Sequence, residues 1–188
     1  MLDTLKIDTS SFASSYPGIK KKYRHSKMEM REELAMANNC IAIGGSSCYA
    51  DMVAVPKDYP DVVIKICSGQ DAFINYAHLC ATGVLNGKHH LKVHSETEIA
   101  PGIWLFVMER LESCLEQHLW DMTVQRAIGW FDLPKRGKYA GICKGLCRDL
   151  KAIESNFADR GYDFCKDLHK GNIMCRKDGT IVYLDPVC

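Results

Sequence analysis

The sequence lacks the features of a membrane-spanning, secreted or nucleic-acid-binding protein. No apolar run among its 188 residues approaches the length of a membrane span. Its first residues lack the basic segment and apolar core that a secretory signal requires. The formal net charge is only +1, which gives no reason to expect nucleic acid or membrane as the main partner. We therefore expect a cytoplasmic protein.

The ten cysteines do not follow the patterns of a metal site or a disulfide scaffold. No two form a C-x-x-C pair, and Cys67 and Cys143 have apolar neighbours, among which cysteine acts as a small hydrophobe. A chain of this size does not need disulfides for stability, so we expect reduced thiols. His89, His90 and His94 form a cluster without nearby thiolates or carboxylates at ligand spacing, which favours a solvated loop over a zinc site.

The residues that are present predict an α+β fold with two lobes. The composition, 47% hydrophobic and 25% charged, is that of a globular protein. Runs of β-forming residues occupy 41–67 and 104–109, whereas helical spacing dominates 112–129 and 139–157. A short strand is expected at 180–184. A β-rich first part followed by a helical second part indicates two lobes with a cleft between them.

Three segments are expected along the chain. Residues 1–40 form an N-terminal leader, with a mobile Ser-rich stretch at 8–18 and a short helix at 28–37. The basic patch at 20–27 is interpreted as a solvated charge run, with contact to phosphate or an acidic partner as the alternative. Residues 41–111 form the β-rich N-lobe and residues 112–188 the helical C-lobe.

The most informative motif lies near the end of the sequence. Asp167 and Asn172 have the Asp-x-x-x-x-Asn spacing of a kinase catalytic loop, and Asp185 follows the β-forming run 180–184. Phosphoryl transfer from ATP needs an Asp that orients and deprotonates the attacking hydroxyl, and an Asn and a second Asp that hold magnesium. A chance polar turn would also fit this spacing alone, so the upstream residues matter.

Lys65 is the upstream residue that strengthens this interpretation. It lies in the β-branched run 62–66, where a lysine needs a partner because burying an unpaired charge is costly. In the kinase arrangement such a lysine reaches the α- and β-phosphates of ATP. An outward-facing lysine on an alternating strand is the alternative, and the downstream motif favours the functional role.

Two further segments are candidates for nucleotide binding. A turn about twenty residues before Lys65 could hold phosphates in a nest of backbone N–H groups, although it also fits an ordinary hairpin turn and lacks the G-x-G-x-x-G form. Its residues are Gly44, Gly45, Ser46 and Ser47. The second segment follows the apolar run 104–108 and fits a linker between lobes. There the adenine edge would meet backbone groups of Glu109 and Leu111, and Met108 would line the pocket or be simply part of a core strand.

With these residues in view, the chain resembles the protein-kinase-like superfamily over roughly residues 41–187. The string from Asp167 to Gly179, followed by Asp185-Pro-Val, is similar to the early host-shutoff serine/threonine kinases of short-tailed lytic phages. The resemblance implies a minimal two-lobed kinase fold and transfer of phosphate from ATP, with Mg²⁺, to Ser or Thr of host cytosolic proteins. It implies that Asp167 is the base and that Lys65 holds the phosphates.

The same resemblance assigns the remaining catalytic-loop residues. Asn172 and Asp185 would be the magnesium ligands. His169 stands where many protein kinases have a phosphate-contacting lysine, so it would assist the γ-phosphate, with packing inside the loop as the alternative role. The helix expected at 71–81 has no Glu to pair with Lys65, which leaves Asp71 or another group to orient it.

Other departures from the kinase pattern predict an enzyme without a regulated activation loop. Asp185-Pro-Val replaces Asp-Phe-Gly, and Cys165-Lys166-Asp167 replaces His-Arg-Asp, whose arginine serves a phosphorylated activation loop. The sequence ends at Cys188, so we expect a truncated C-lobe, and either a constitutively active, minimal kinase or a truncated one that recognises its target through other surfaces. A homodimer that replaces the missing part stays open.

Two alternative functions are also open. The catalytic loop is similar to those of aminoglycoside and choline-type phosphotransferases, which act on small molecules but usually carry a large helical insert. A kinase-shaped protein that inhibits a host protein by binding alone is the other alternative. For the kinase, the Ser-rich segment from Thr9 to Ser15 is a predicted autophosphorylation site.

Overall fold

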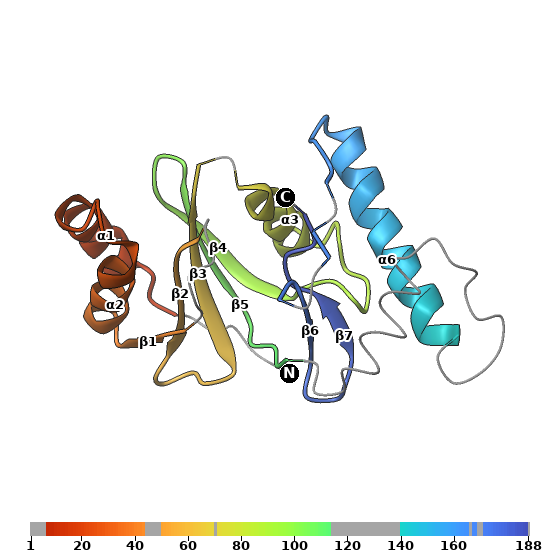
Figure 1. Cartoon of the computed structure of the whole chain (residues 1–188), viewed down its shortest axis with the longest axis horizontal. Coiled ribbons are helices and arrows are strands. Elements are labelled where there is room, and N and C mark those ends of the chain that lie inside the picture. Colours follow the sequence, from red (N-terminus) through yellow and green to blue (C-terminus); the bar gives the residue numbers. More distant parts are fainter. Residues whose placement is uncertain are drawn as a thin grey trace. The chain divides into compact units, whose positions relative to one another are not determined.

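The structure is a computed structural model. It describes residues 7–43, 50–69, 71–113, 140–165, 167–168 and 171–187. The chain divides into two compact units, each described here by itself. The first comprises Met1–Ala81 and Lys92–Arg110, and the second comprises Thr82–Leu91 and Leu111–Cys188. Helices and strands both contribute, which confirms the α+β class (Figure 1).

A five-stranded antiparallel sheet forms the centre of the first unit. Its strands lie in the order β1 (Cys40–Ala42), β2 (Ala50–Pro56), β3 (Val62–Ser68), β5 (Ile103–Glu109) and β4 (Val93–Ala100). The apolar runs predicted as strands are confirmed. Strand β4 was not predicted from the sequence. It is an edge strand with two register irregularities, and it shows little of the apolar alternation that marks a strand.

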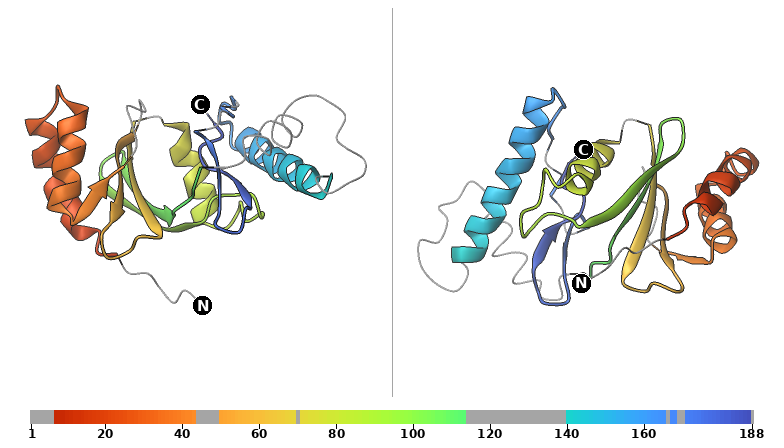
Figure 2. Two further views of the ribbon diagram at one scale, coloured as in Figure 1. Left: turned by 60° about the horizontal axis from the view of Figure 1, so that its bottom comes forward. Right: turned by 180° about the vertical axis from the view of Figure 1, so that it is seen from behind.

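Two N-terminal helices, α1 (Ser10–Lys22) and α2 (Lys27–Ala37), cover one face of this sheet (Figure 2). The helix predicted at 28–37 is confirmed as α2. The expectation of a mobile Ser-rich leader is wrong, because α1 buries an apolar stripe at helical spacing. The side chains of this stripe are Phe12, Tyr16 and Ile19.

A buried polar contact joins α1 to strand β2. The Tyr16 hydroxyl donates to the carboxylate of Asp51, which is 3% exposed, and Lys20 Nζ lies 3.0 Å from the same carboxylate. Lys22 forms a second ion pair, at 2.8 Å, with Glu33 of α2. The basic patch at 20–27 is therefore solvated only in part, since Lys20 pairs with a buried carboxylate whereas the Lys22 pair lies at the surface.

Helix α3 (Ala72–Ala81) lies on the other face of the sheet (Figure 2). Phe73 from its first turn is fully buried and contacts Phe106 of β5 edge-to-face, with ring centroids 5.6 Å apart. Asp71 precedes the helix and accepts the Phe73 N–H at 3.0 Å, so it acts as an N-cap. The helix predicted at 71–81 is confirmed.

The second unit contains helix α6 (Ala140–Asp159) and a hairpin of β6 (Ile173–Cys175) and β7 (Ile181–Tyr183). The helix predicted at 139–157 is confirmed as α6, and its apolar side chains at helical spacing are buried at Leu146, Leu150 and Ile153. The strand predicted at 180–184 is confirmed as β7. The helix predicted at 112–129 lies outside the described residues.

Two further findings concern the chemistry of the chain. Cys175 is disulfide-bonded, so the expectation of reduced thiols is wrong for this residue. Sequence spacing does not reveal such a bond, because it depends on proximity in the fold. Five other cysteines are not disulfide-bonded, namely Cys40, Cys67, Cys80, Cys147 and Cys165. Among the described helices, none combines the length and apolarity needed to cross a membrane.

Candidate active site

The structure brings Asp167, Asn172 and Asp185 together in the second unit. The Asn172 side chain donates from Nδ2 to Asp167 Oδ2 at 2.8 Å and to the Asp167 backbone oxygen at 2.9 Å. The Asp167 N–H donates to the carbonyl of Pro186, the residue that follows Asp185, at 3.0 Å. All three predicted residues are half-buried.

The β6–β7 hairpin is the reason these residues meet. Antiparallel pairing places Ile173 opposite Tyr183, so the residue before β6 lies beside the residues after β7. Asn172 precedes β6, and its carbonyl accepts the N–H groups of Leu184 at 2.8 Å and Asp185 at 3.3 Å. The thirteen-residue separation of Asn172 and Asp185 in sequence is thus closed by one short hairpin.

Lys65 lies on β3 of the first unit, opposite Val53 of β2 and Phe106 of β5. Its residue exposure is 8%, so it is not the solvated lysine considered as the alternative. The ammonium Nζ lies 3.3 Å from the centroid of the Phe73 ring. The cost of burying the charge is therefore offset in part by an aromatic face.

The predicted adenine contacts fall at the end of β5 and just beyond it. Met108 is buried between Val63 of β3 and Val93 of β4 in the sheet register. The Glu109 N–H donates to the Lys92 carbonyl at 3.0 Å, so this N–H is not the backbone group that an adenine would meet. Leu111 begins the second unit and is buried.

Five predicted site residues lie outside the described residues. They are Gly44, Gly45, Ser46, Ser47 and His169. Their proposed contacts with phosphate stay predictions from the sequence.

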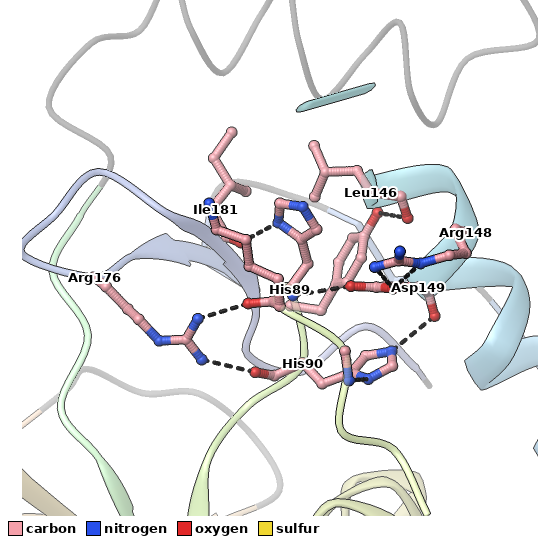
Figure 3. A network of polar contacts seen from close by, with 10 residues as sticks. His89, His90, Leu146, Arg148, Asp149, Arg176 and Ile181 are labelled. Atoms are coloured by element: carbon pink, nitrogen blue, oxygen red, sulfur yellow. Dashed lines mark hydrogen bonds and ion pairs between the residues drawn. The ribbon is translucent and has the colours of Figure 1, made fainter. Parts of the chain in front are cut away.

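Sequence reasoning missed a polar network in the second unit, which Figure 3 shows. His89 and His90 are 5% and 4% exposed, so the expected solvated loop is wrong for both. The His89 N–H donates to Asp149 Oδ2 at 2.9 Å, and His90 Nε2 contacts the Asp149 carbonyl at 2.8 Å. Arg176 donates to the carbonyls of Lys88 at 2.6 Å and His90 at 2.9 Å. This network fastens segment 82–91 to α6 and to the hairpin.

The hydrogen-bond partners of the two imidazoles determine which ring nitrogen donates in each. The Gly87 N–H donates to His90 Nδ1 at 2.9 Å, so this nitrogen carries no proton and Nε2 donates to Asp149. His89 Nδ1 lies 2.7 Å from the Ile181 carbonyl and must be the donor. Burial lowers the pKa of both histidines, which agrees with two neutral rings. Burial opposes ionisation of Asp149, but hydrogen bonds from Arg148 and His89 hold the pKa of its carboxyl below the usual value.

Two glycines make room for this network. A Cβ at Gly87 would lie 2.5 Å from the Asp149 carboxyl carbon, and a Cβ at Gly145 would lie 2.6 Å from His89 Nε2. Neither position can carry a side chain unless its neighbour moves. In the sequence, the two glycines are the only sign of this close packing. Nothing in the neighbouring residues indicates which groups approach them.

The donor set fits a magnesium ion held together with phosphate oxygens. Because Asn172 Nδ2 binds Asp167, the amide oxygen is the atom that could serve as a ligand, and Asp185 adds a carboxylate. Mg²⁺ is commonly held by one or two protein oxygen donors, with substrate phosphates and water completing its shell. Within the described parts of the chain, His, Cys, Asp and Glu do not form a metal-binding group of three or more.

Compared with known proteins, the sequence matches no family model and no curated protein.

Proposed function

We propose that the protein is an ATP- and magnesium-dependent phosphotransferase. The observation that carries this proposal is the convergence of Asp167, Asn172 and Asp185 at the ends of one hairpin, with Asn172 hydrogen-bonded to the Asp167 carboxylate at 2.8 Å. Phosphoryl transfer depends mainly on positioning and on electrostatic stabilisation, and a fixed carboxylate beside two metal-binding oxygens meets both needs.

In this proposal Asp167 orients the acceptor hydroxyl and takes its proton as the hydroxyl oxygen bonds to the γ-phosphorus. The bond from that phosphorus to the bridging oxygen breaks, and ADP leaves with the electron pair. Magnesium, held by Asn172 and Asp185, would neutralise charge on the phosphates. Lys65 would hold the phosphates that are not transferred. The backbone of Gly44 to Ser47 would hold phosphates as well.

The proposed acceptor is a Ser or Thr hydroxyl of host cytosolic proteins, and the proposed source is a lytic phage. This part rests on the string from Asp167 to Gly179 followed by Asp185-Pro-Val. Autophosphorylation is proposed between Thr9 and Ser15. Ser10, Ser11 and Ser14 are exposed on the first turns of α1.

The test is incubation of the purified protein with γ-labelled ATP and magnesium, with and without a cytosolic extract. We expect label on protein Ser and Thr in the wild type and none in Asp167→Ala or Asp185→Ala. Asp163→Ala is the matched control, because Asp163 is an exposed carboxylate of the same unit. Urea unfolding of each variant separates loss of chemistry from loss of fold.

The outcomes also separate the alternatives. Label on small molecules alone would favour a small-molecule phosphotransferase. An inhibitor that acts by binding would be favoured by two results together. The wild type would turn over no ATP, and the Asp167→Ala variant would keep the biological effect of the wild type. Mass spectrometry that finds residues 9–15 unmodified after incubation with ATP would exclude autophosphorylation there.

A further inference from the structure

The environment of Lys65 contains an aromatic face at contact distance. Lys65 Nζ lies 3.3 Å from the ring centroid of Phe73, which is completely buried, and Lys65 itself is 8% exposed. An aromatic ring carries negative charge density on its face, and a cation held there gains most where water is excluded. This contact therefore contributes directly to where the ammonium sits.

The Phe73 ring is itself held from two directions. Its backbone N–H is bound by Asp71 Oδ1 at 3.0 Å, which fixes the start of α3. Its ring meets Phe106 at an interplanar angle of 89°, and Phe106 lies directly opposite Lys65 in the β3–β5 register. A ring fixed by a helix cap and by the neighbouring strand can define a position for a flexible lysine side chain.

The identity of the contacting residue matters for the charge of the site. Helix α3 contains no Asp or Glu, and the Asp71 carboxylate caps the helix through Oδ1. An aromatic face attracts an ammonium group although the ring carries no formal negative charge of its own. An aromatic partner thus suits a lysine that is meant to meet phosphate.

We propose that Phe73 is the positioning residue that holds the Lys65 ammonium for the phosphates of ATP. This inference rests on the proposed function and names a group that orients Lys65. Asp71 contributes indirectly, because it caps the helix that carries Phe73.

The test uses the full chain with Phe73→Leu, which removes the ring face, and Phe73→Tyr, which retains it. Phe12→Leu is the matched control, because Phe12 is a buried phenylalanine of the same unit whose core lies on the opposite face of the sheet. The Lys65 ε-methylene protons are observed by NMR in each variant, since a ring face at this distance shifts them upfield. ATP turnover is measured in parallel.

We expect Phe73→Leu to lose the upfield shift and to raise KM for ATP on the order of tenfold, with a smaller fall in kcat. KM responds more than kcat because the clamped phosphates are bound equally in the ground state and the transition state. Phe73→Tyr should retain the upfield shift and the wild-type KM for ATP. Phe12→Leu should lower the stability of the protein and leave KM and kcat unchanged. A Phe73→Leu protein whose KM and kcat match those of Phe12→Leu would overturn the proposal.

Fluorinated phenylalanines at position 73 provide a test that does not depend on the folding of Phe73→Leu. They keep the shape of the ring but withdraw charge from its face, so KM for ATP should rise with each added fluorine. A KM that is independent of fluorination overturns the positioning role. A wild type that shows the upfield shift but neither binds nor turns over ATP overturns the proposed function, and the positioning role with it, while the contact itself stands.

Discussion

A single side-chain nitrogen joins two residues of the candidate active site: Asn172 Nδ2 donates to both the backbone oxygen and the carboxylate of Asp167, at 2.9 and 2.8 Å. These bonds set the side-chain orientation of both residues at once. The Asp167 carboxylate is kept from turning, and Asn172 presents its amide oxygen on the opposite edge of the amide group from the nitrogen that binds Asp167. The first prediction tests this coupling.

Replacing Asn172 with Ala should cost about 1–2 kcal/mol of unfolding free energy, because two partly exposed hydrogen bonds are lost. If the proposed function is correct, phosphotransfer should fall by at least about 100-fold, because the base is no longer positioned and a proposed magnesium ligand is lost as well. Asn156→Ala is the control, since the Asn156 side chain bonds the Ala152 carbonyl at 2.8 Å within α6. That variant should lose stability but keep its activity, and an equal loss of activity in both variants would contradict the coupling.

The stability of the protein should fall in mild acid because of His89 and His90. Burial lowers the pKa of both from 6.5, so the unfolded chain takes up these protons at a higher pH than the folded protein does. Their contribution is complete above about pH 6.5 and decreases as the pH falls below it, by up to ~1.4 kcal/mol per pH unit for each histidine. Urea unfolding between pH 7.5 and 5 measures this slope.

The variant His90→Asn isolates one of these two histidines. An Asn oxygen can still accept the Gly87 N–H, while the titrating group is gone, so the slope between pH 6.5 and 5 should fall to about half. His25→Asn is the control, because His25 is exposed on the connection after α1. An unchanged slope in His90→Asn would show that other groups cause the acid sensitivity.

Two glycine-to-alanine substitutions in helices should have opposite effects. At Gly145 the added Cβ would lie 2.6 Å from His89 Nε2, and the resulting overpacking should cost about 1–3 kcal/mol. At Gly18 of α1 the Cβ would meet nothing within 4 Å, so alanine should stabilise by roughly 0.5–1 kcal/mol through helix propensity. Thermal unfolding of both variants decides the matter, and a Gly145→Ala protein as stable as Gly18→Ala would exclude the close approach of His89.

Removing the Tyr16 hydroxyl should loosen α1 from the sheet. The Phe variant leaves the buried Asp51 carboxylate without one of its donors, which should cost about 1–3 kcal/mol. Tyr59→Phe is the control, because Tyr59 is 40% exposed. The measurement is the urea midpoint together with hydrogen exchange of α1, which should accelerate in Tyr16→Phe alone.

Local patterns were enough to predict much of this molecule. The α6 stripe, the strands β3 and β5 and the spacing from Asp167 to Asp185 each extend over twenty residues or fewer. Within such a stretch, helical or strand periodicity decides which side chains are buried. The grouping of Asp167, Asn172 and Asp185 was predictable because one short hairpin creates it.

The features that sequence reasoning missed depend on distant partners or on misleading composition. His89 is bound by groups 60 and 92 residues further along the chain, and no local pattern reports such contacts. In α1 the serines dominate the composition, while three apolar residues at helical spacing determine the structure. No local pattern singles out Phe73, because its contact with Lys65 arises only when helix and sheet pack.

The hydrogen bonds between segment 82–91 and the later part of the second unit determine how that unit could be expressed alone. The chain passes from one unit to the other after Ala81, after Leu91 and after Arg110. One cut at Arg110 would therefore give a C-terminal fragment without the backbone that pairs with Tyr183 and covers Asp149. The second unit is built from two separate segments of the chain, so expressing it alone would require joining residues 82–91 to residues 111–188.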